Sequence, residues 1–286
     1  FPSYAKLAEG ADTLVVNGCE CEPLLYTDYT ILKRELPMVL HGIRAVMEYC
    51  GLTRALLSVK EHTAKRLGFT EGQRLADGVY ARVLGNTYPA GDEITLIYEA
   101  TGRLVRPGNL PITKGVIVYN VETMYNLARA MKYGDSVTTK WLTVGGDIAR
   151  PVVLRVPIGT LVRDIFERLG ITVDDSHAVI EGGPSMGKII NHETAEVCKT
   201  TKAILVLPKD TRAVESKLIN ERAAVKRAET ACCQCTRCTD MCPRALLGYP
   251  LEPHKMVRTA MSVADVTPEL VLTATLCCGC GICESL

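Results

Sequence analysis

The sequence predicts an α/β fold. Over residues 1–135, short apolar runs of strand length alternate with longer segments in which apolar residues recur at helical spacing. Such alternation is typical of a parallel sheet covered by helices. The chain has 286 residues, 47% of them hydrophobic and 23% charged, which is the composition of an ordinary globular protein with room for about two domains.

The expected elements follow in order along the chain. Strands are expected at residues 12–16, 55–59, 81–84 and 115–119. A long helix is expected at 27–49, and Gly51 closes it. From residue 136 the pattern changes to strands at 141–146 and 151–156, a short helix at 161–169, and strands near Ala178 and Ala203. This second order suggests a small β-grasp-like unit over 136–208, followed by a connecting helix within 210–230.

Charge and hydropathy exclude two classes of function. The formal net charge is +1, and no run of Lys or Arg is dense enough to follow a phosphate backbone, so we expect no nucleic-acid partner. The longest apolar stretches have the length of strands and fall far short of the roughly 20 residues that a membrane helix needs. Because the sequence begins with Phe1 and not with Met, we expect it to be part of a longer polypeptide.

The cysteines are concentrated at one end of the chain. Nine of the 13 cysteines lie from Cys232 onward, whereas a disulfide framework would be spread over the fold, so a reducing, cytosolic setting is expected. The spacing C-x2-C-x2-C-x3-C-P from Cys232 to Pro243 is that of bacterial ferredoxins, in which three thiolates hold one cluster and the fourth is donated to another. A second run, C-x2-C-x2-C, starts at Cys277.

These two runs predict two 4Fe-4S clusters. Seven cysteines are the expected ligands: Cys232, Cys235, Cys238, Cys242, Cys277, Cys280 and Cys283. We expect Cys242 to complete the cluster of the second run, and the first run to take its fourth thiolate from beyond residue 286. The additional Cys233 and Cys278 are out of register and are expected not to be ligands. The alternative is a pair of zinc sites, although zinc has no need of the third cysteine and the Cys-Pro step in each run.

A second candidate site lies near the start of the chain. The loop from Asn17 to Asp28 places Glu20 and Glu22 directly after an expected strand, where open α/β sheets hold their ligands. The alternative is a solvated turn in which Thr27 or Asp28 caps the following helix.

Four segments resemble, in order and spacing, the flavin subunit of respiratory complex I and its relatives: FPSYAK at 1–6, NGCECEP at 17–23, YPAGDE at 88–93 and NVET at 120–123. The resemblance extends over nearly the whole chain. Two ferredoxin-type clusters at the C-terminal end are similar to those of RnfC-type subunits and of PduS-type cobalamin reductases of propanediol-utilisation microcompartments. The sequence at 1–7, 98–103 and 120–123 favours the PduS type.

The resemblance implies an oxidoreductase in which NADH reduces FMN, and electrons leave through the two clusters to cobalamin or a corrinoid-carrying enzyme. A flavin is the required converter, because a hydride carries two electrons and each cluster accepts one. By motif, nine residues would line the flavin and nicotinamide site: Lys6, Asn17, Glu20, Tyr88, Gly91, Asp92, Glu93, Asn120 and Thr123. The resemblance gives Lys6 a phosphate or ring oxygen, the two Asn residues the isoalloxazine edge, and the acids the ribose hydroxyls or the carboxamide.

The resemblance also implies three domains: an FMN- and NADH-binding domain at 1–135, a β-grasp (SLBB-like) domain at 136–208 with the turn 182–187 near the cofactors, and a connecting helix with the dicluster module at 209–286. Two departures matter, because Cys19 stands where the flavin subunit of complex I has Asp and because the family's glycine-rich phosphate loop lies upstream of Phe1. The alternatives are an RnfC-like subunit of an ion-translocating NADH:ferredoxin oxidoreductase and a non-catalytic electron-wiring subunit. A cytoplasmic location, or one inside a bacterial microcompartment, is implied, with the shell or other electron-transfer proteins as partners.

Overall fold

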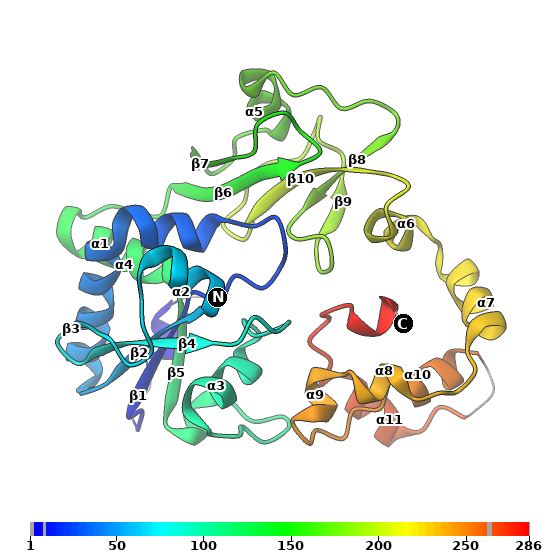
Figure 1. The fold of residues 1–286 in the computed structure, drawn as a ribbon, viewed down its shortest axis with the longest axis horizontal. Coiled ribbons are helices and arrows are strands. Elements are labelled where there is room, and N and C mark those ends of the chain that lie inside the picture. The colour runs from blue at the N-terminus through cyan, green and yellow to red at the C-terminus, as the bar shows by residue number, and fades with distance from the viewer. Residues whose placement is uncertain (1–2, 8–9, 262–264, 286) are drawn as a thin grey trace.

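The computed structural model describes residues 3–7, 10–261 and 265–285. Figure 1 shows two sheets, one above the other, with a strap of helices that leads to a helical module at the C-terminal end. The first sheet has the order β3-β4-β2-β1-β5. Its strands are β1 (Thr13–Asn17), β2 (Ala55–Lys60), β3 (Arg74–Ala76), β4 (Val79–Leu84) and β5 (Val116–Asn120). All are parallel except β3, which runs antiparallel to β4.

Helices cover both faces of this sheet, as an α/β fold requires. They are α1 (Thr27–Cys50), α2 (Glu61–Leu67), α3 (Glu93–Thr101) and α4 (Val121–Tyr133), with short 3-10 helices η1 (Ser3–Lys6) and η2 (Pro111–Lys114). Alternation along β1 explains the two cores. Leu14 and Val16 pack with α1 and α4, whereas Val15 points to the other face and packs with α3.

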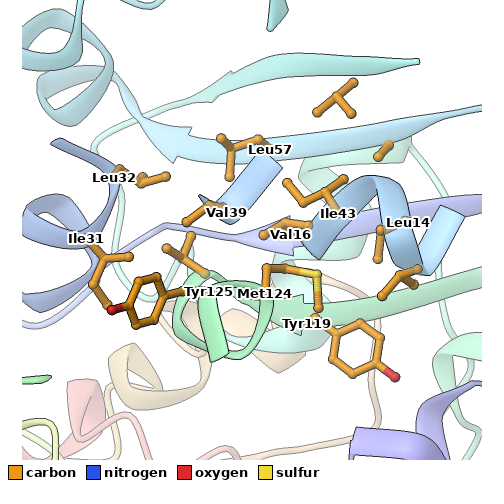
Figure 2. Packing of buried hydrophobic residues seen from close by; sticks show 14 of the residues in the cluster. Leu14, Val16, Ile31, Leu32, Val39, Ile43, Leu57, Tyr119, Met124 and Tyr125 are labelled. Atoms are coloured by element: carbon orange, nitrogen blue, oxygen red, sulfur yellow. The ribbon is translucent and has the colours of Figure 1, made fainter. Parts of the chain in front are cut away.

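The larger core lies between the sheet and the helices α1 and α4 (Figure 2). Ile31, Val39 and Ile43 of α1 meet Met124 and Tyr125 of α4 over the strands. The two helices approach very closely at Gly42, where an added Cβ would lie 2.0 Å from the carbonyl oxygen of Met124. The alternating pattern of the sequence is confirmed here, and the long helix ends at the left-handed Gly51 as expected.

The second sheet has the order β7-β6-β10-β8-β9. Its elements are β6 (Thr139–Gly146), β7 (Val152–Pro157), α5 (Val162–Leu169), β8 (His177–Glu181), β9 (Lys188–Ile190) and β10 (Ala203–Pro208). The last strand β10 runs parallel to β6, and the other pairs are antiparallel. Helix α5 covers one face of this sheet with Ile165 and Phe166.

Strand β6 docks the second sheet on the first domain. Trp141 belongs to the core of the first domain and meets Tyr125 edge-on, with ring centroids 6.2 Å apart. Next to it, the buried ammonium of Lys140 pairs with the buried carboxylate of Glu122 at the start of α4. Thr27, the first residue of α1, is also buried and bonds to Thr143 of β6. The two sheets therefore share a packed and hydrogen-bonded contact.

The connecting segment differs from the prediction. In place of one helix within 210–230 there are two, α6 (Arg212–Leu218) and α7 (Glu221–Ala231). The break falls at Asn220, whose side chain accepts a hydrogen bond from the N–H of Ala223 and caps α7. Asn is among the preferred N-cap residues, which explains why a new helix begins there.

The C-terminal module consists of short helices. They are α8 (Arg237–Asp240), α9 (Pro243–Leu246), α10 (Pro253–Ala260), α11 (Pro268–Ala274) and the 3-10 helix η3 (Ile282–Ser285). In Figure 1 the red η3 turns back and lies between α6 and α8, and a hydrogen bond from Arg212 to the carbonyl of Glu284 ties it to α6. Within the described residues, no helix combines the length and the apolar character needed to cross a bilayer.

Candidate functional site

A first pocket lies at the carboxyl ends of β1 and β5. It has a volume of about 270 Å³. Five of the nine predicted site residues line it: Lys6, Asn17, Glu93, Asn120 and Thr123. The position follows from the topology, because parallel strands deliver their C-terminal residues to one edge of the sheet, and Asn17 and Asn120 lie opposite each other in the β1–β5 register.

Lys6 is fixed above this edge by two acceptors. Its Nζ lies 2.6 Å from Glu93 Oε1 and 3.1 Å from the carbonyl oxygen of Val118. An ammonium has three donors, so a further oxygen can still bind to it. This arrangement fits the expected phosphate or ring-oxygen partner, although Glu93 is engaged with Lys6 and not directed to the pocket alone.

The two asparagine side chains hold the surrounding loops. Asn17 Nδ2 donates to Gly91 O at 2.9 Å, and its Oδ1 accepts from the N–H of Cys19 at 3.0 Å. Asn120 Nδ2 donates to Asn17 O at 3.2 Å and to Asp28 Oδ2 at 3.1 Å. Both amides therefore already position the loops that surround the pocket, and their expected contact with an isoalloxazine edge stays a prediction.

A second pocket, of about 330 Å³, shares Asn17 and Asn120 with the first. Three separate parts of the chain meet in it. The acidic loop contributes Cys19, Glu20, Cys21 and Glu22, the second sheet contributes Met186 and Lys202, and the C-terminal module contributes Cys278 and Cys280. Of the other predicted residues, Gly91 and Asp92 also line it. The predicted site is thus divided over two adjoining pockets.

Glu20 caps the long helix. Its carboxylate accepts hydrogen bonds from the N–H groups of Asp28 at 2.9 Å and Tyr29 at 3.3 Å. The alternative of a solvated turn capped by Thr27 or Asp28 is therefore wrong, because both residues are buried within α1 and the acidic loop supplies the cap. Burial, with the nearby Asp28 carboxylate, raises the pKa of Glu20 to about 7.

Asp28 forms an ion pair that the sequence does not suggest. The Lys202 Nζ lies 2.5 Å from Asp28 Oδ1, and Asp28 is only 3% exposed. Burial alone would lower the pKa of Lys202, but the carboxylates of Asp28 and Glu20 raise it. The pair joins the loop before β10 to the start of α1, and its partners are 174 residues apart in sequence.

Glu22 fixes the turn between β8 and β9 against the acidic loop. Its carboxylate accepts hydrogen bonds from the N–H groups of Ser185 at 2.9 Å and Met186 at 2.7 Å. Gly183 is required at this contact, since an added Cβ would lie 2.3 Å from Glu22 Cδ. The turn 182–187 therefore lies beside the second pocket, where the sequence places it.

Tyr88 and Asp92 face the C-terminal module. Tyr88 Oη donates to the carbonyl oxygen of Cys280 at 2.7 Å, and Tyr88 lines neither pocket. Asp92 caps α3 through its contact with the N–H of Thr95, and its other oxygen accepts from Arg244 Nη2 at 2.9 Å. These contacts differ from the expected role of Asp92 in binding a ribose or a carboxamide, because both of its oxygens already have partners.

The two cysteine loops have the same backbone geometry. Gln234 and Thr236 in the first loop have positive φ, as do Gly279 and Gly281 at the equivalent positions of the second loop. Cys232 Sγ accepts from the Gln234 side chain and Cys277 Sγ from the N–H of Gly279, both at 3.3 Å. Left-handed residues between the cysteines turn the chain tightly, and N–H groups directed at sulfur stabilise thiolates. Both loops fit the ligands of a cluster.

Cys242 lies with the second run, as the exchange of ligands between the two runs requires. Burial raises the pKa of Cys283, and the thiols of Cys277 and Cys242 add to this effect. Burial likewise raises the pKa of Cys238, with a contribution from Cys232. Among the described residues, no three His, Cys, Asp or Glu side chains converge closely enough to hold one metal ion. The thiolates of a 4Fe-4S cluster each bind a different iron, so this spacing is compatible with them.

The comparisons with known proteins agree with both halves of the site. Residues 1–129 match the Nuo51 FMN-binding domain family, and residues 231–286 match the 4Fe-4S dicluster domain family. Over all 286 residues the chain is 38% identical to the cobalamin reductases PduS of Citrobacter freundii and Salmonella typhimurium. The chain is a relative of PduS. It spans 63% of the length of these two PduS proteins.

Other relatives and solved structures are similar over much of the chain. One component of the proton-translocating ferredoxin:NAD(+) oxidoreductase complex of Clostridium ljungdahlii is 30% identical over 86% of this PduS relative and 52% of its own length. A crystal structure of an NAD+-reducing [NiFe]-hydrogenase superposes with a TM-score of 0.60 and 18% identity over 99% of this chain and 56% of that one. The latter likeness shows the fold alone.

Proposed function

We propose that this chain is the flavin and iron–sulfur part of an NADH-dependent reductase that passes electrons from FMN through two 4Fe-4S clusters to cobalamin or a corrinoid-carrying enzyme. One observation carries the proposal. Cys278 and Cys280 of the second cysteine run line the same pocket as Asn17 and Asn120, and Tyr88 bonds directly to the Cys280 backbone. The predicted flavin site and one predicted cluster are therefore immediate neighbours.

The flavin would be held at the carboxyl edge of the first sheet. Lys6, Asn17, Glu93, Asn120 and Thr123 line that pocket, and the first of them supplies a cation. Bound there, FMN supplies the conversion of a two-electron hydride into single electrons. The protein would orient the ring through the asparagines, while the turn 182–187 and Lys202 close the adjoining pocket on the opposite side.

The domain boundaries belong to the same proposal. We place the FMN- and NADH-binding domain at 1–135, the β-grasp (SLBB-like) domain at 136–208 and the dicluster module with its connecting segment at 209–286. The second sheet supports its part of this division, since two strands, a helix and three further strands follow one another and the last strand lies parallel to the first. A location inside a microcompartment, with the shell as partner, is proposed from the resemblance to PduS-type proteins.

The test is an anaerobic reconstitution of the full-length protein with iron, sulfide and FMN. Analysis of bound iron, sulfide and flavin is followed by addition of NADH and then of cob(II)alamin. We expect two clusters and one flavin, bleaching of the cluster absorbance by NADH, and reduction of the cobalamin. Bound zinc in place of iron, or a bound flavin that does not respond to NADH, would contradict the proposal.

The second candidate is an RnfC-like role, with ferredoxin in place of cobalamin as the reaction partner. The similarity to components of ion-translocating ferredoxin:NAD(+) oxidoreductase complexes supports it. A rate with reduced or oxidised ferredoxin that exceeds the rate with cobalamin would favour this candidate. The third candidate, an electron-wiring subunit without NADH chemistry, is favoured by Cys19 in the flavin loop and by a flavin that exchanges electrons only with the clusters.

A further inference from the structure

The segment after Cys242 docks the cluster module on both ends of helix α3. Arg244 Nη2 donates to Asp92 Oδ1 at 2.9 Å, at the N-terminus of α3. Tyr249 Oη donates to Val105 O at 2.6 Å, beyond the C-terminus of the same helix. The Arg244 guanidinium also lies over the Tyr249 ring, 5.4 Å from its centroid. The module is therefore anchored to the element that follows the predicted flavin loop.

The ion pair in this anchor is buried. The side chains of Arg244 and Asp92 are 10% and 14% exposed, and the Arg244 Nε is buried with no hydrogen-bond partner among the described residues. Burying two charges costs free energy that apolar residues of similar volume would not cost. Docking alone, which Tyr249 also provides, therefore does not explain why charges stand here.

Both charges lie next to the predicted cluster of the second cysteine run. Arg244 follows Cys242 by two residues, and Asp92 lines the pocket that contains Cys278 and Cys280. A hydrogen bond with Cys280 is the main cause that lowers the pKa of Cys278, and in addition Asp92 raises and Arg244 lowers that pKa. The two charges thus act on the same region with opposite sign.

We propose that Arg244 and Asp92 are positioning residues that set the reduction potential of the cluster held by Cys242 and the second cysteine run. The inference rests on the proposed function. In the step concerned, one electron leaves the flavin and enters this cluster, and no bond in the protein forms or breaks. Because reduction adds negative charge, Arg244 favours the reduced cluster and Asp92 disfavours it. The pair thereby adjusts the cluster to its electron donor.

The test is a potentiometric titration of the reconstituted full-length protein with dithionite and redox mediators, followed by EPR. This readout does not require NADH. We expect Arg244→Gln to lower the midpoint potential of one cluster and Asp92→Asn to raise it. The double variant should return toward the wild-type value. Asn remains a good N-cap, so α3 is preserved in Asp92→Asn. Arg244→Lys keeps the charge and should keep the midpoint near that of the wild type.

The matched control is Arg222→Gln on α7, which removes the same charge from an exposed position and should leave both midpoints unchanged. Shifts of Arg244→Gln and Asp92→Asn in the same direction, or no shift in either, would overturn the inference and leave the pair a docking contact. If Arg244→Gln fails to assemble, Asp92→Asn and Arg244→Lys still decide. Opposite shifts in a protein that NADH cannot reduce would overturn the proposed function and support the inference.

Discussion

Lys202 Nζ donates to Asp28 Oδ1 at 2.5 Å and so joins the loop before β10 to the first turn of α1. Because Asp28 is 3% exposed, Lys202→Met would leave a buried carboxylate without its cation. We expect a loss of roughly 3 kcal/mol in the free energy of unfolding. Urea unfolding followed by the fluorescence of Trp141, the single tryptophan, measures it. Lys199→Met, at an exposed position nearby, is the control, and equal stabilities of the two variants would contradict the prediction.

The raised pKa of Glu20 predicts a pH dependence of stability. Its pKa is about 7 in the folded protein and 4.5 in the absence of these surroundings, so the fold favours the protonated carboxyl. This contribution is fully present below pH 4.5 and is lost as the pH rises toward 7. Between these values, thermal unfolding of the wild type should fall more steeply with pH than that of Glu20→Gln, which does not titrate. Parallel pH profiles of the two proteins would show the assignment to be wrong.

Gly91 is predicted to be essential for the shape of the flavin loop. An added Cβ would lie 2.3 Å from Cys19 O and 2.7 Å from Cys21 Sγ, so Gly91→Ala must displace the acidic loop. We expect a cost of about 1–3 kcal/mol and a clear loss of bound flavin after reconstitution. Gly85→Ala is the control in the same connection, since its Cβ would meet only Thr87 Cγ2 at an ordinary 3.8 Å. A flavin content of Gly91→Ala equal to that of the control would refute the prediction.

The cysteine pairing predicts which variants lose which cluster. If Cys242 serves the second run, Cys242→Ser and Cys277→Ser should remove one and the same EPR signal and about half of the bound iron, whereas Cys232→Ser should remove the other. Cys233→Ser, at an exposed position outside the spacing, should retain both clusters. A Cys242→Ser variant that loses the same signal as Cys232→Ser would mean that each run holds its own cluster without exchange.

The fold could be predicted from the sequence wherever one element follows a simple period. The apolar run of β1 and the helix closed by Gly51 lie where their patterns place them. Strand β3 was not predicted, because three half-exposed residues carry no period, and the break at Asn220 was hidden within a continuous helical pattern. Local signals therefore sufficed for long elements and failed for short ones.

The site was predictable only where a motif contains it. The resemblance brought Asn17 and Asn120 to one edge, but the partners that complete the pockets come from other parts of the chain. Lys202 and Arg244 lie in no motif, and their acidic partners are 174 and 152 residues away in the sequence. No local pattern marks such pairs. Tertiary contacts alone show that Asp92 binds an arginine of the cluster module.

The most direct test of electron transfer from the flavin to the clusters is an anaerobic NADH titration of the reconstituted full-length protein, followed together by flavin absorbance and by EPR. We expect the flavin to be reduced first and the EPR signal of reduced clusters to appear in the same titration. Cys277→Ser should weaken or abolish that signal while the flavin is still reduced. A wild-type flavin that NADH reduces while both clusters stay oxidised would contradict the proposed path.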